Sequence, residues 1–190
     1  MSRLQALAAQ PRLALGALLT LLLAAAAVVG SGADFTATSA NPANTFSSGT
    51  LTIGNSKAGT AVLSATNMRP GDPATTGDVD IENTGSLSGA FTLSHGTIGD
   101  SDATNPLSAK LDLVVKDCGS FSGSTAPPCG DGDDVTIYSG TLAAMGQDLG
   151  LGNYAAAAKH RYRFSVQLNG SAGNQYQGDS STVQFDFNAG

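Results

Sequence analysis

Carboxylates are the side chains of this sequence that could most readily bind a metal ion. Asp131, Asp133 and Asp134 lie in the Gly-rich stretch CGDGDD, and carboxylate oxygens on such a loop are typical ligands of Ca²⁺. The stretch lacks the bidentate Glu that completes a twelve-residue calcium loop, and Asp-Gly is common in solvated turns. The three residues are therefore a weak calcium candidate, and a solvated turn is the alternative interpretation.

Catalytic side chains of other kinds are scarce. The sequence contains two histidines, His95 and His160, and a single glutamate, Glu82. It has no His-Glu-x-x-His motif, in which two His one helical turn apart bind zinc and the Glu acts as base. His95 falls in a turn signal, His160 is expected on the polar side of a strand, and Glu82 is expected to point outward. We predict no catalytic residue and no cofactor, and we do not expect an enzyme.

The two cysteines, Cys118 and Cys129, lie in DCGSFSGSTAPPCGDGDD. An exported chain meets an oxidising compartment, in which such a pair forms a disulfide. The bridge would close a short flap between the strands expected on either side of it. A pair of metal ligands is the alternative, but no His lies nearby to complete a site.

The first 33 residues have the layout of a secretory signal peptide. They carry Arg3 and Arg12 but no acidic residue, and an apolar run extends from Leu13 to Val29. The run is slightly shorter than the roughly 20 residues of a membrane-spanning helix. Small residues follow, so we predict cleavage between Ala33 and Asp34. An uncleaved anchor is the alternative, and it would be the chain's contact with a membrane.

The remaining residues, 34–190, are of ordinary size for one domain. Removing residues 1–33 removes two basic residues and no acidic one, so the formal net charge changes from −6 to −8. An acidic surface of this kind disfavours nucleic acid and anionic lipid as partners. We expect a secreted protein at the cell surface or outside the cell.

Apolar residues alternate with polar ones along most of the expected strands. In HRYRFSVQL the residues Tyr162, Phe164, Val166 and Leu168 share one face. The same period appears in GDVDIEN, AKLDLVVKD, DDVTIYSG and STVQFDFN, where the apolar members are Val79, Ile81, Leu111, Leu113, Val115, Val135, Ile137, Val183, Phe185 and Phe187. This period is typical of half-buried antiparallel strands.

Turn signals separate these strands. In RPGD, Pro70 and Gly71 occupy the two central positions of a type II turn, because Pro fixes φ and Gly accepts a positive φ. About nine short strands separated by such turns predict an all-β fold. The fold expected is a two-layer antiparallel β-sandwich of the jelly-roll or immunoglobulin-like kind. We expect at most one or two short helical turns.

Four motifs follow one another along the chain, and together they carry a family resemblance. TFSSGTL spans residues 45–51, and it is followed by NMRPGD, VDIENTGSLSG and NQYQGDSSTVQFDFNA. In this order they resemble the T-F-x-x-G-T-L, L-K-P-G-D, N-x-G-S-L and N-x-Y-Q-G-x-S motifs of the TasA/camelysin family of secreted bacterial fibre proteins. Proteins of that family are exported through a SipW-type signal peptidase.

The resemblance implies a jelly-roll subunit that polymerises into extracellular fibres of a biofilm matrix or cell-surface coat. The partners it implies are further copies of the chain, a SipW-type signal peptidase and other matrix proteins. Members of the family are also described as camelysin metallopeptidases, so the resemblance also implies peptidase activity. No metal-binding motif in this sequence supports that activity. The chain departs from the best-known fibre formers in its shorter middle and in its cysteine pair.

Residues 34–44 directly follow the expected cleavage site and could themselves form a strand. In DFTATSA, Phe35, Ala37 and Ser39 share one face, and Phe35 is the large apolar residue on it. Cleavage could free this strand for donation to the sheet of a second copy. The alternative is an ordinary edge strand or a frayed terminus. A fibre subunit, a non-polymerising surface or adhesion module, and a secreted metallopeptidase are the three functions considered.

Overall fold

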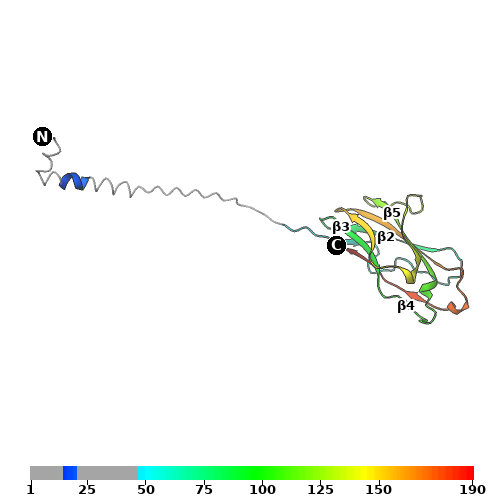
Figure 1. Cartoon of the computed structure of the whole chain (residues 1–190). Helices are drawn as coiled ribbons and strands as arrows, with labels where there is room; N and C mark the ends of the chain where they lie inside the picture. Colours follow the sequence, from blue (N-terminus) through cyan, green and yellow to red (C-terminus); the bar gives the residue numbers. More distant parts are fainter. Residues whose placement is uncertain (1–14, 21–46) are drawn as a thin grey trace. The chain divides into compact units, whose positions relative to one another are not determined.

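The computed structural model describes residues 15–20 and 47–190 of the chain (Figure 1). Residues 15–20, within the predicted signal peptide, form a short helix. Residues Ser47–Gly190 form a compact unit of their own. Over these described ranges, no helix combines the length and the apolar character needed to cross a membrane.

Ten strands, all paired antiparallel, form the compact unit, and the all-β sandwich predicted from the sequence is confirmed. The larger sheet has the order β1 (Ile53–Asn55), β2 (Thr75–Asn83), β8 (Lys159–Leu168), β5 (Leu111–Phe121), β6 (Val135–Thr141). The second has the order β10 (Phe185–Ala189), β3 (Gly89–His95), β7 (Leu149–Tyr154). A small third sheet joins β4 (Gly99–Asp100) to β9 (Ser181–Thr182).

Helical structure in residues 47–190 is limited to single turns. Three 3₁₀ turns are present, one more than expected: η1 (Leu107–Lys110), η2 (Leu142–Ala144) and η3 (Asn174–Tyr176). The RPGD turn forms as predicted: Gly71 has a φ of 81°, and Asp72 N donates to Arg69 O at 3.1 Å. Strands therefore form the framework of this part of the chain.

Residues of the predicted alternating faces meet in the core between the two main sheets. Val79 and Ile81 of β2 are buried, as are Tyr162 and Phe164 of β8. The register explains this agreement, because Val79 lies opposite Tyr162 and Gly77 opposite Phe164. Burial of each large apolar side chain contributes about 1.5–3 kcal/mol, so this layer stabilises the sandwich.

Two side chains differ from the prediction, His160 in its side of the strand and Val135 in its exposure. His160 is on the inner side of β8, where its ring stacks on Tyr154 with centroids 4.6 Å apart. Its Nδ1 lies 2.9 Å from Asp117 Oδ2. This hydrogen bond offsets the cost of partly burying the polar ring. Val135 is 61% exposed, because β6 is the edge strand of its sheet and its pairing with β5 shifts register after Val115.

Asn83 is a fully buried polar residue at the end of β2. Its Nδ2 donates to the carbonyl oxygens of Leu87, Tyr154 and Ala155, and its Oδ1 accepts from Gly85 N. The side chain thereby ties the turn after β2 to the turn after β7. Full satisfaction of its hydrogen bonds removes the cost of burying an amide.

Candidate functional site: an apolar groove and a disulfide-closed flap

An apolar groove of about 790 Å³ opens between the two main sheets. Both sheets contribute to its lining, and the aromatic side chains come from β10. The apolar residues of strands and 3₁₀ turns in the lining are Leu107, Leu111, Leu113, Leu142, Val166, Phe185 and Phe187. A groove of this composition suits an apolar or strand-forming occupant better than an ionic substrate.

The segment of residues 61–68 borders this groove and packs on the core. Val62, Leu63, Ala65 and Met68 are all half-buried against the core cluster. Among the described residues, no backbone amide or carbonyl of this segment forms a backbone hydrogen bond. The segment is therefore held by side-chain packing without a ladder of its own.

Gly77 of β2 is the place where the segment comes closest to the sheet. A Cβ atom at this position would overlap the carbonyl oxygen of Val62 and would lie 2.8 Å from the Cβ of Leu63. A residue larger than glycine would thus push the segment away. Glycine is required here for the close approach of two backbones.

The edge of β2 beside this segment is only partly paired. β1 pairs with the three residues at positions 81–83, and Ser56 N donates to Asp80 O. Within the described part of the chain, no strand pairs with Thr75–Val79 on that side, whereas β8 pairs with the opposite side. Among the residues that the structure describes, this half of β2 therefore has backbone groups that no strand pairs with, of the kind to which a strand can be added.

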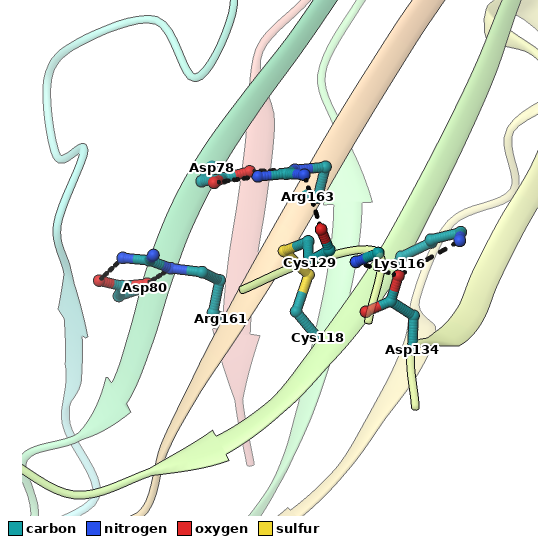
Figure 2. A network of polar contacts seen from close by, with 9 residues as sticks. Asp78, Asp80, Lys116, Cys118, Cys129, Asp134, Arg161 and Arg163 are labelled. Atoms are coloured by element: carbon teal, nitrogen blue, oxygen red, sulfur yellow. Dashed lines mark hydrogen bonds and ion pairs between the residues drawn. A yellow bond between two sulfur atoms is a disulfide. The ribbon is translucent and has the colours of Figure 1, made fainter. Parts of the chain in front are cut away.

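Cys118 and Cys129 form the predicted disulfide, with Cα atoms 5.0 Å apart. The bridge closes a flap between β5 and β6. Figure 2 shows Arg163 of β8 reaching both the flap and a neighbouring strand. Its Nε and Nη2 donate to the carboxylate of Asp78 at 2.7 Å each, and its Nη1 donates to the carbonyl of Cys129 at 3.1 Å. The flap is thus fastened to β8 as well as to β5.

The same contacts shift the pKa of both partners. Hydrogen bonds from Arg163 lower the pKa of Asp78, although burial opposes this. Hydrogen bonding to Asp78 raises the pKa of the Arg163 guanidinium. The pair therefore stays ionised at neutral pH, as a structural contact on the outer face of the sheet.

The three aspartates predicted as weak calcium ligands form separate hydrogen bonds and do not share a partner. The side chain of Asp134 is 4% exposed, and its Oδ2 accepts hydrogen bonds from Lys116 Nζ at 3.3 Å and Gly130 N at 2.8 Å (Figure 2). Asp131 and Asp133 are exposed, and Asp131 Oδ1 accepts from Asp133 N. In residues 15–20 and 47–190, no three His, Cys, Asp or Glu side chains are grouped so that they could hold a metal ion. The structure does not bring the three carboxylates together.

Two buried tyrosines form a polar pair inside the core. The hydroxyl groups of Tyr154 and Tyr162 are hydrogen-bonded to each other. Burial raises the pKa of both phenols well above the usual range. Both phenols stay neutral at physiological pH, so their role is in packing.

A ladder of ion pairs across β2 and β8 was not anticipated. Asp80 accepts hydrogen bonds from Arg161, and Glu82 lies 2.9 Å from Lys159 Nζ. Together with Asp78 and Arg163, these residues form three consecutive cross-strand pairs. The signal was present in the sequence, because the acidic and the basic residues each recur with the period of a strand.

The remaining site predictions concern the N-terminal region. Ala33 and Asp34 at the cleavage site, and Phe35, Ala37 and Ser39 of the expected donor strand, lie outside the described residues. They remain predictions.

Comparison with known proteins gives no family assignment. No family model matches the chain, and no curated protein matches it. The resemblance to the TasA/camelysin family therefore rests on the four motifs quoted above.

Proposed function

We propose that the protein is a secreted structural subunit that polymerises into extracellular fibres by adding its N-terminal strand to a second copy. Two observations carry this proposal: the apolar groove between the sheets, and the half of β2 that no described strand pairs with on one side. An added strand could form backbone hydrogen bonds with Thr75–Val79 and place apolar side chains in the groove. The disulfide is compatible with a secreted protein.

The N-terminal residues suit the proposed occupant. Residues 35–46 carry no charged side chain, although the chain as a whole is acidic. Phe35 offers a large apolar side chain whose burial contributes about 1.5–3 kcal/mol. Apart from Asp34 at its start, the donor carries no acidic side chain, which limits the repulsion that two acidic surfaces impose on close contact.

Electron microscopy of the mature protein at rising concentration tests the proposal. We expect fibres from the wild type and none from Phe35→Asp, whose monomer should stay folded. Val135→Asp is the matched control, because it places the same charge on the exposed edge strand β6. Loss of fibres in the control alone would mean that assembly uses β6. Absence of fibres in every protein would favour a non-polymerising surface or adhesion module.

A further inference from the structure

The turn that follows β8 contains the only Asn-Gly pair of the sequence, Asn169-Gly170. In such a pair the glycine nitrogen can attack the preceding Asn side chain and form a cyclic succinimide, because glycine has no Cβ to hinder the attack. Gly170 is exposed, and apart from its chain neighbours no heavy atom lies within 4 Å of the position that a Cβ would take. Its amide nitrogen forms no backbone hydrogen bond among the described residues. The attacking nitrogen is therefore accessible.

The side chain of Asn169 is held by groups that suit the intermediate of this reaction. Ser171 N and Ser171 Oγ donate to Asn169 Oδ1 at 2.9 and 2.7 Å. This oxygen becomes negatively charged when the carbonyl carbon is attacked, and donors at such distances stabilise an oxyanion. Asn169 Nδ2 donates to Asp112 Oδ2 at 2.8 Å, so a carboxylate faces the nitrogen that must gain a proton before it leaves.

We infer that Asn169-Gly170 is a self-modifying site, at which Gly170 N attacks Asn169 Cγ and the side-chain nitrogen leaves as ammonia. The new bond between Gly170 N and Asn169 Cγ closes the succinimide. Solvent takes up the proton of Gly170 N and supplies the proton that the leaving nitrogen needs. Water then opens the ring and leaves an aspartate or an isoaspartate at this position. The reaction consumes one water molecule and needs no oxidant or reductant.

The product would loosen the end of the larger sheet. A carboxylate at position 169 would face the carboxylate of Asp112, and two negative charges at this distance repel each other. Asn169 N also donates to Lys110 O, and the adjacent Leu111 lines the groove. The modification would thus weaken one wall of the groove. This inference goes beyond the proposed function and does not depend on it.

A different modification competes for the same side chain. Asn169, Gly170 and Ser171 match the Asn-x-Ser acceptor motif of N-glycosylation. A sugar would occupy Asn169 Nδ2 and prevent the loss of this nitrogen as ammonia. The intact mass of the exported protein distinguishes the two, and a glycan on Asn169 would overturn the inference.

Peptide mapping by mass spectrometry measures the conversion of Asn169 during incubation at neutral pH, because replacement of the side-chain NH2 by OH raises the mass. We expect faster conversion in the folded wild type than in the same protein unfolded in urea, since the folded protein keeps the three hydrogen bonds in place. Equal or slower conversion in the folded protein would overturn the inference.

A substitution tests the oxyanion directly. Ser171→Ala removes one of the two donors to Asn169 Oδ1 and should slow the conversion by about fivefold or more. Ser139→Ala, at an exposed position of β6, is the matched control and should leave the rate unchanged. If the hydrogen bonds of Ser171 merely restrained Asn169, Ser171→Ala would convert at least as fast as the wild type, and this result would overturn the inference.

Discussion

Arg163 and Asp78 form a doubly hydrogen-bonded ion pair across β8 and β2, with both N···O distances at 2.7 Å. A bidentate contact of this kind fixes the orientation of both side chains. The third hydrogen bond of the guanidinium reaches the flap carbonyl of Cys129, so the pair links sheet and flap (Figure 2).

Asp78→Asn should lower the free energy of unfolding by about 1 kcal/mol at pH 7, since the pair is partly exposed and screened by solvent. The folded-state pKa of Asp78 lies below its ordinary value of 3.8. Its contribution is therefore present above that pH and is lost as the pH falls through the folded-state pKa. Urea denaturation at several pH values should show the two proteins converging in acid. Asp133→Asn, at an exposed position, should have little effect; a gap that widened in acid would contradict the argument.

Loss of the disulfide should destabilise the domain without unfolding its core. The chain-entropy model gives about 3 kcal/mol for a short loop, and the flap lies outside the buried layer around Phe164. Denaturation of Cys118→Ser with Cys129→Ser, compared with the wild type, measures this cost. Reductant should affect the wild type and leave the double variant unchanged. Two free thiols in the exported wild type, found by non-reducing mass spectrometry, would refute the bridge.

The tyrosine pair should behave as one unit. Tyr154→Phe or Tyr162→Phe alone leaves a buried hydroxyl without its partner, at a cost of about 1–3 kcal/mol. The double Phe variant should cost less than the sum of the two single variants, because it leaves no unpaired hydroxyl. A double-mutant cycle of unfolding free energies measures this coupling, and strict additivity would show that the hydroxyls do not interact.

The secreted protein should begin within two residues of Asp34. Ser31-Gly32-Ala33 follows the apolar run directly and matches the small-x-small cleavage pattern. N-terminal sequencing of the exported protein gives the answer. A start beyond Phe46 would remove both the predicted cleavage site and the donor strand.

The alternation of apolar and polar residues predicted the central strands well, because one face of each strand is buried. Val79, Ile81, Tyr162 and Phe164 are buried as expected from their period. The same rule failed for Val135, since a period of two cannot show that a strand lies at the edge of its sheet. His160 was wrongly assigned to the polar side of its strand, although it has the same parity as Tyr162 and its ring packs inward on Tyr154.

The groove could not be predicted from any single stretch. Its lining brings Leu111 and Leu113 of β5 together with Phe185 and Phe187 of β10, which are far apart in the sequence. Residues 61–68 show no regular period, so their position against Gly77 follows only from the path of the whole chain. The disulfide was accessible to sequence reasoning, because the chain has only two cysteines and they are separated by 11 positions in the sequence.

The ladder of ion pairs between β2 and β8 leaves one ambiguity that Asn83 resolves. The acidic and basic residues both recur every second position, so sliding β8 by two residues would still place Asp78 opposite Arg161 and Asp80 opposite Lys159. Charge pairing alone therefore discriminates poorly against this misaligned sheet. The buried amide of Asn83 occurs once, and the same slip would separate it from the carbonyls of Tyr154 and Ala155 just before β8. The slip would keep two of the three ion pairs, so the single buried amide of Asn83 adds to the preference for the native alignment.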